Sequence, residues 1–233
     1  MLLYAITSRK LLKGDDADQR QRLVELASEW ARGGVDTIQI REKDLPLTEL
    51  QALAAKIVQS VRSAGGKTRV LVNGPAQVAL DAGADGVHLP ASPAGQLPVN
   101  DALSGGAATA VRAAHQVYDR ASREVIVSAA CHSEEEIRQA AGASMLLFSP
   151  VFEKVMAERT TRGVGLTALR AAVELAAPVP VLALGGVTEK NAAACVQAGA
   201  AGVAAIRLFL GDAWRSLRDA QPPAVPGSMR LSS

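Results

Sequence analysis

The stretch Val179-Pro-Val-Leu-Ala-Leu-Gly-Gly186 contains the pattern that decides the fold. Its first six residues are almost continuously apolar, which is typical of a strand buried on both faces of a parallel sheet. The pair Gly185-Gly186 ends the strand, and we expect Val187-Thr-Glu189 to open a helix with Thr188 as its N-cap. A strand followed directly by a helix is the repeating unit of parallel α/β folds.

The same unit recurs along the whole chain. The expected strands are Leu2–Thr7, Thr37–Arg41, Arg69–Asn73, Gly86–Leu89, Glu124–Ser128, Ser144–Ser149, Val179–Leu184 and Gly202–Ile206. Between them, apolar residues recur at intervals of three and four, as at Leu50, Leu53, Ile57 and Val61, so each helix has one face for the sheet. Eight such units in 233 residues predict an α/β protein with one domain, a (β/α)8 TIM barrel.

The barrel domain is expected to span residues 1–220. Pro, Gly and Ala crowd the stretch from Pro90 to Arg123, where we expect the fourth helix near Thr109 to Arg120. Residues 221–233 carry three prolines and little apolar periodicity, which predicts a loose tail.

The composition excludes several classes of protein. Apolar residues make up 48% of the chain and the formal net charge is 25 − 23 = +2, with only 3% aromatic residues, so we expect neither disorder nor a nucleic-acid partner. Two cysteines cannot build a disulfide framework, and no run of eighteen apolar residues occurs, so we expect a cytoplasmic protein without a membrane partner. Alanine-rich outer helices are compatible with a homo-oligomer, and the sequence leaves the oligomeric state open.

Barrels of this kind carry their working site at the carboxyl ends of the strands. Few polar residues occur there, and they are Thr7, Ser8, Gln39, Arg41, Glu42, Lys43, Asn73, His88, Cys131, His132 and Ser149.

The glycine pair after the seventh strand suggests a phosphate site. Two glycines let an anion approach backbone N–H groups, and the start of a helix adds partial positive charge. Barrels often bind phosphate between the loops after strands seven and eight. The expected phosphate-binding residues are Gly185, Gly186, Ala205, Ile206 and Arg207. The alternative is a tight turn in which the glycines serve only the backbone conformation.

The segment Gln39-Ile-Arg-Glu-Lys43 offers cations at the second strand end. Gln39 and Arg41 share one face of the strand by the two-residue period. Arg41 could clamp a carboxylate or a phosphate, and Lys43 could add a point charge. An internal ion pair of Arg41 with Glu42 or another carboxylate is the alternative, and both can hold.

His132 is the candidate acid/base residue. It follows the fifth strand and precedes Ser133 and Glu134–Glu136, which suit an N-cap and a first helical turn. Histidine is the commonest general acid/base near neutral pH, whereas a lone histidine at a helix start also serves as a hydrogen-bonding spacer. We expect Cys131 to be a packing residue and His88 to be structural.

Six motifs in order carry a resemblance to a known family. They are Gln39-Ile-Arg-Glu-Lys43, Val72-Asn-Gly74, Ala84-Asp-Gly-Val-His-Leu89, His132-Ser-Glu-Glu135, Pro150-Val-Phe152 and Leu184-Gly-Gly-Val-Thr188. From Met1 to about Leu210 the chain resembles the thiamine phosphate synthase / TenI superfamily. The resemblance implies a (β/α)8 barrel whose small-molecule ligand is the thiazole phosphate of thiamin biosynthesis.

The synthase branch of this superfamily couples a pyrimidine diphosphate to the thiazole phosphate with Mg²⁺. That branch has an Asn-Asp pair after strand three, an acid after strand four and a Thr/Lys-bearing loop after strand six. Here Asn73 precedes Gly74, and Leu89-Pro-Ala-Ser-Pro93 contains no acid. A hard divalent cation would be poorly held by so few carboxylates.

The branch that resembles TenI-like thiazole tautomerase fits the same places better. It implies that His132 is the catalytic acid/base residue, that Arg41 or backbone donors hold the substrate carboxylate, and that Gln39 and Asn73 shape the ring pocket. Lys43 and Gly163 complete the expected substrate-binding set, with no metal and no cofactor. The alternatives are a divergent thiamine phosphate synthase and a non-catalytic barrel that binds a phosphorylated ligand in a regulatory role.

Overall fold

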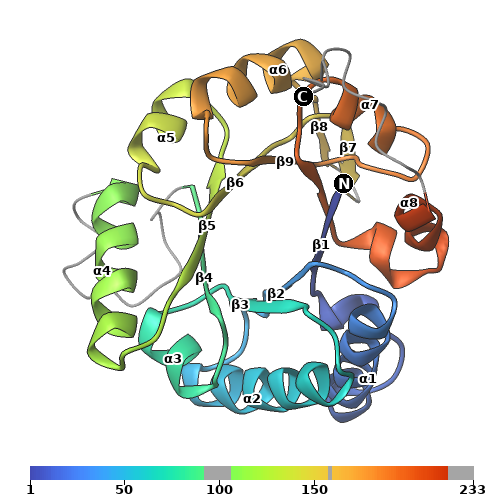
Figure 1. The fold of residues 1–233 in the computed structure, drawn as a ribbon. Coiled ribbons are helices and arrows are strands. Elements are labelled where there is room, and N and C mark those ends of the chain that lie inside the picture. Colours follow the sequence, from blue (N-terminus) through green and yellow to red (C-terminus); the bar gives the residue numbers. More distant parts are fainter. Residues whose placement is uncertain (92–105, 157–158, 220–233) are drawn as a thin grey trace, which may run out of the picture.

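The computed structural model describes residues 1–91, 106–156 and 159–219, and it forms a closed barrel of parallel strands surrounded by helices (Figure 1). The barrel strands are β1 (Leu2–Ile6), β2 (Thr37–Ile40), β3 (Arg69–Val72), β4 (Gly86–Leu89), β5 (Ile126–Cys131), β6 (Met145–Phe148), β9 (Val181–Leu184) and β10 (Gly202–Ala205). Each pairs with its neighbours in the order β1-β10-β9-β6-β5-β4-β3-β2, which confirms the predicted (β/α)8 barrel.

The helices lie outside the ring of strands, as Figure 1 shows. They are α1 (Asp16–Arg32), α2 (Leu47–Ser63), α3 (Ala76–Asp81), α4 (Gly106–Arg120), α5 (Glu134–Gln139), α6 (Gly165–Ala176), α7 (Ala192–Gln197) and α8 (Ser216–Asp219). A short antiparallel pair, β7 (Lys154–Met156) and β8 (Arg159–Thr161), follows β6 and was not predicted. The segments Arg9–Leu11, Arg207–Leu210 and Ala213–Arg215 are 3-10 helices.

The apolar core has two parts because strand side chains alternate between the two faces of the sheet. The smaller part fills the barrel interior and consists of Tyr4, Ile6, Leu71, Leu147, Leu182 and Ala204. The larger part lies between the strands and the helices. Trp30 of α1 belongs to it, and its indole N–H donates to the carbonyl oxygen of Phe209 at 2.8 Å. The candidate site residues lie beyond this interior core, at the carboxyl ends of the strands.

The fifth strand lies further along the chain than the sequence predicted. It spans Ile126–Cys131 instead of Glu124–Ser128, because the N–H of Ile126 bonds the carbonyl oxygen of Asp85 and Ile126 pairs with Gly86. Cys131 is consequently the last strand residue, paired with Phe148, and not a loop residue.

The fourth helix begins at Gly106, a few residues before the predicted start, and ends at Arg120 as expected. The predicted tail, 221–233, lies outside the described residues, as does 92–105. Within the described ranges, no helix has both the length and the apolar character that crossing a bilayer requires.

Candidate active site

His132 lies at the carboxyl end of β5 and is oriented by the end of β6. Its Nδ1 is 2.6 Å from the carbonyl oxygen of Ser149 and 3.2 Å from the Ser149 hydroxyl oxygen. The His132 N–H donates to Glu136 Oε2 at 2.5 Å, and Ser133 caps α5 by accepting from the N–H of Glu136, as predicted. The imidazole is exposed, so its remaining nitrogen is accessible to a ligand.

Arg41 lies at the end of β2 with a guanidinium that no carboxylate neutralises among the described residues. The predicted alternative, an ion pair with Glu42, is wrong because Glu42 turns the other way and binds Arg9 at 3.2 Å. Partial burial lowers the pKa of Arg41, and the charge of Glu42 opposes that shift. A half-buried cation without a counter-ion is a suitable partner for an anionic substrate.

The other predicted polar residues of this side lie on β2 or directly after β2 and β3. Gln39 on β2 is 1% exposed, and its Oε1 has no hydrogen-bond partner among the described residues. Asn73 is half-buried, and its N–H donates to the carbonyl oxygen of Ile40 at 2.9 Å, which places it beside Arg41. Lys43 is exposed, and partial burial together with the charge of Arg41 lowers its pKa.

His88 forms a buried network with two hydroxyl groups below these residues. Its Nδ1 is 2.9 Å from Ser128 Oγ, which also lies 2.9 Å from the Tyr4 hydroxyl. Burial lowers the pKa of His88 to about 3, with smaller effects from the charges of Arg41 and Lys43. His88 is therefore a neutral, structural residue, as expected from the sequence.

Cys131 is fully buried, and burial raises the pKa of its thiol to about 12. Since the thiolate is the nucleophilic form of cysteine, this residue packs and does not react at neutral pH.

The glycine pair lies directly against the segment that follows β6. Gly185 has φ +92° and a Cβ there would lie 2.7 Å from Pro150 Cα, while Gly186 has φ +64° and a Cβ there would lie 2.5 Å from the carbonyl oxygen of Glu153. Both glycines therefore have a positive φ, which the alternative of a tight turn anticipated, and also a packing reason, which it did not. This contact also packs the loop after β9 against the segment after β6, where the carbonyl oxygen of Ser149 binds His132.

Thr188 is not a helix N-cap, because α7 begins four residues later at Ala192. The side chain of Asn191 closes a turn instead: its Oδ1 accepts from the N–H of Thr188 at 2.8 Å, and its Nδ2 donates to the carbonyl oxygen of Gly186 at 2.9 Å. The loop, not a helix end, therefore presents the backbone donors at this place. An Asn three residues after Thr188 is a signal of such a turn that the sequence reasoning missed.

Backbone N–H groups without an acceptor among the described residues lie in the loops that follow the neighbouring strands β9 and β10. Within the part of the chain that the structure describes, the N–H groups of Gly186, Val187 and Ile206 donate to no protein acceptor. Ala205 is buried as the last residue of β10, and Arg207 is exposed without an ion pair to a described carboxylate. Unpaired N–H groups on adjacent loops are suited to binding a phosphate.

Gly163 is required by close packing. A Cβ at this position would lie 2.5 Å from the carbonyl oxygen of Val151, and the neighbouring N–H of Val164 bonds the carbonyl oxygen of Pro150. Gly163 thus supports the segment beside Ser149.

The described residues do not fit a Mg²⁺ ion. After β3, a Cβ at Gly74 would lie 3.2 Å from Leu50 Cδ2, so this position is packed against α2 and carries no carboxylate. After β4, Leu89-Pro-Ala91 contains no acid, and no three His, Cys, Asp or Glu side chains gather to hold a metal in the described ranges. Carboxylate ligands for Mg²⁺ are therefore missing at Gly74 and in the described residues Leu89–Ala91.

The comparisons with known proteins agree in one family. The family model described as thiamine monophosphate synthase matches residues 3–209. A thiamine-phosphate synthase of Methanoculleus marisnigri is 33% identical over 93% of this chain and 93% of its own length. A second one, of Roseiflexus castenholzii, is 31% identical over 90% of this chain and 81% of its own length.

A solved structure shows the same fold. Thiamine phosphate pyrophosphorylase from Pyrococcus furiosus has a TM-score of 0.68 and 28% identity, covering 92% of this chain and 90% of that one. The names of these relatives correspond to the synthase, which the sequence reasoning kept as its alternative, and not to the tautomerase branch that it favoured.

Proposed function

The chain belongs to the thiamine monophosphate synthase family, and from this premise we propose that its barrel binds a thiazole phosphate and catalyses tautomerisation of carboxythiazole phosphate. The observation that carries this proposal is the contact of 2.6 Å between His132 Nδ1 and the carbonyl oxygen of Ser149. A carbonyl oxygen can only accept, so Nδ1 holds a proton and Nε2 is left as a base.

Tautomerisation needs one base that returns the proton it takes. His132 Nε2 removes the proton from the ring carbon, and the electrons of the broken C–H bond form a double bond within the ring. The double bonds shift so that the exocyclic C=C bond becomes a single bond, and the imidazolium protonates the exocyclic carbon with the electron pair released there. Histidine suits both steps because its pKa lies near neutral pH. Ser149 holds the ring orientation throughout, since its carbonyl oxygen accepts from Nδ1 in both charge states.

The remaining residues bind the two anionic ends of the substrate. Arg41 supplies a cation for the carboxylate, because no carboxylate of the described chain occupies it. The N–H groups of Gly186, Val187 and Ile206 supply donors for the phosphate. These groups bind and orient the substrate without requiring a metal ion.

A second candidate function is synthesis of thiamine phosphate from a pyrimidine diphosphate and thiazole phosphate. The names of the relatives favour it, whereas the lack of carboxylates at Gly74 and in the segment Leu89-Pro-Ala-Ser-Pro93 disfavours it. A purely binding, regulatory barrel is the third candidate.

The test is turnover of the non-aromatic tautomer of carboxythiazole phosphate, followed by the ultraviolet absorbance of the aromatic product. We expect enzyme-dependent aromatisation. Binding of the aromatic phosphate without turnover would indicate the regulatory role, and formation of thiamine phosphate on addition of the pyrimidine diphosphate would indicate the synthase.

A further inference from the structure

Arg9 carries a buried charge next to the candidate site. It is 3% exposed, although arginine is seldom buried unless it is paired. Its Nη1 and Nη2 donate to the two oxygens of Asp44 at 2.7 and 2.6 Å, and its Nε donates to Asp16 at 3.0 Å. The hydrogen bonds that Arg9 donates to Asp44 raise the pKa of Arg9, and they hold the pKa of Asp44 well below its usual range.

Glu42 is a second buried charge that the same arginine holds. It is 3% exposed and accepts from Arg9 Nη1 at 3.2 Å and from the Arg9 backbone N–H at 3.2 Å. The hydroxyl of Thr7 also donates to Glu42, at 2.5 Å. These donors come from the segment after β1, so Glu42 is turned away from the neighbouring side chain of Arg41.

Thr7 connects this pair to the backbone of Arg41. Its Oγ1 accepts from the Arg41 N–H at 2.9 Å while it donates to Glu42. The main chain of Arg41 is therefore fixed by the network, and its guanidinium remains without a carboxylate partner among the described residues. The charge of Glu42 acts on Arg41. Glu42 would therefore be the counter-ion of Arg41 if Arg9 did not bind it.

We propose that Arg9 is a positioning residue, which binds Glu42 and Asp44 so that Arg41 stays free to bind a substrate anion. The identity of that anion rests on the proposed function, whereas the arrangement of the charges does not. A carboxylate that paired with Arg41 inside the protein would compete with the substrate. Arg9 removes this competitor, and it does so without touching the ligand.

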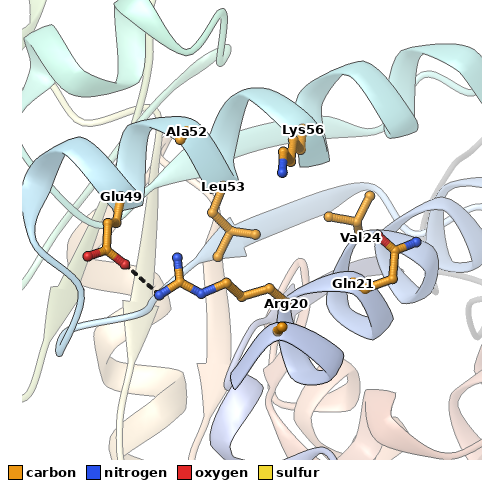
Figure 2. A pocket seen from close by; sticks show the side chains of 8 residues that line it. Arg20, Gln21, Val24, Glu49, Ala52, Leu53 and Lys56 are labelled. Carbon is orange, nitrogen blue, oxygen red and sulfur yellow. Dashed lines mark hydrogen bonds and ion pairs between the residues drawn. The ribbon is translucent and has the colours of Figure 1, made fainter. Parts of the chain in front are cut away.

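The outer end of the network provides a matched control. Within α1, Arg20 donates to Asp16 at 2.6 Å, and it donates to Glu49 of α2 at 2.5 Å beside the hollow between the two helices (Figure 2). Asp16 and Glu49 are about half exposed, with side-chain exposures of 54% and 47%, so these ion pairs contribute little to stability. Arg20→Gln removes a charge close to Arg9 without changing any contact of Glu42.

The first test is the substitution Arg9→Met, which removes the charge and keeps a long apolar side chain. A crystal structure of this variant should show the Glu42 carboxylate within salt-bridge distance of Arg41. KM for carboxythiazole phosphate tautomer should rise at least about tenfold with kcat within about threefold, because an internal anion competes for the binding cation. Arg20→Gln should match the parent.

The second test is rescue. Arg9→Met combined with Glu42→Gln should lower KM back toward the parent value, since the competing carboxylate is gone. If Arg9→Met alone fails to fold, the double variant should still fold, because it contains no buried Glu42 carboxylate without a cation. A purely structural role for Arg9 predicts instead that the double substitution restores folding alone, while folded Arg9→Met already has the KM of the parent; that result would overturn the inference.

The crystal structure also separates this inference from the proposed function. Glu42 unmoved and Arg41 unpaired in Arg9→Met would overturn the inference, whatever the parent catalyses. A parent that does not turn over the tautomer would refute the proposed function, while a new Arg41–Glu42 pair in the variant would still support the role of Arg9.

Discussion

His132 Nδ1 lies 2.6 Å from the carbonyl oxygen of Ser149, so the ends of β5 and β6 together fix one imidazole ring. The contact joins residues seventeen positions apart in the chain. It leaves Nε2 free to take and return a proton. The proposed proton transfer therefore depends on both strand ends.

Replacing His132 should remove the proton carrier. We expect His132→Gln to lower kcat by about 10² to 10⁴, the usual contribution of a positioned acid/base, with product affinity within about threefold. Stopped-flow absorbance of the tautomer reaction measures the rate. His115→Gln on the outer helix α4 is the matched control and should retain the parent rate; an unchanged rate in His132→Gln would transfer the role to another group.

The backbone donors of the β9 and β10 loops should hold the phosphate. In crystals soaked with inorganic phosphate, we expect the ion within hydrogen-bond distance of the N–H groups of Gly186 and Ile206, because these groups have no protein acceptor in the described chain. Arg207 is exposed, so Arg207→Ser should change the dissociation constant of thiazole phosphate by less than about threefold. Phosphate bound only at other positions around the carboxyl ends of the barrel strands would contradict this assignment.

Catalysis should not depend on a divalent cation. No carboxylate stands at Gly74 or within Leu89-Pro-Ala-Ser-Pro93 to hold Mg²⁺, and departure of a diphosphate ordinarily requires such an ion. We expect tautomer turnover to be equal with and without EDTA, and no thiamine phosphate from the two synthase substrates. Thiamine phosphate synthesis that EDTA abolishes would assign the chain to the synthase branch.

Buried His88 should make the protein less stable in mild acid. Burial lowers its pKa to about 3 in the folded state, against 6.5 for the ordinary group, so the unfolded chain binds the extra proton between these values. The free energy of unfolding should therefore fall as pH decreases below 6.5, by about 2 kcal/mol from this group between pH 7 and pH 5.

Urea unfolding of the parent and of His88→Gln at pH 7 and pH 5 measures this contribution. Glutamine keeps a polar partner for Ser128 but does not titrate, so the loss between the two pH values should be smaller in the variant. Equal losses would mean that His88 is protonated in the folded protein.

Much of the fold was predictable because it depends on local patterns. Runs such as Val179–Leu184 identify buried parallel strands, and eight of them with intervening helical spacing close a barrel. The place of β5 was not predictable to the residue, because Ile126 rather than Glu124 starts it through a hydrogen bond to Asp85. That bond joins residues forty-one positions apart in the chain, which local propensity does not record.

The sequence by itself determined the barrel and placed Arg41, His132 and the glycine pair after the carboxyl ends of its strands, because the buried strand runs can be recognised locally. Only the tertiary structure decided which charges pair there. Glu42 and Arg41 are adjacent in sequence, yet Glu42 binds Arg9 from the preceding strand end. A buried carboxylate takes the partner that offers most hydrogen bonds in space, and that partner is not fixed by distance along the chain.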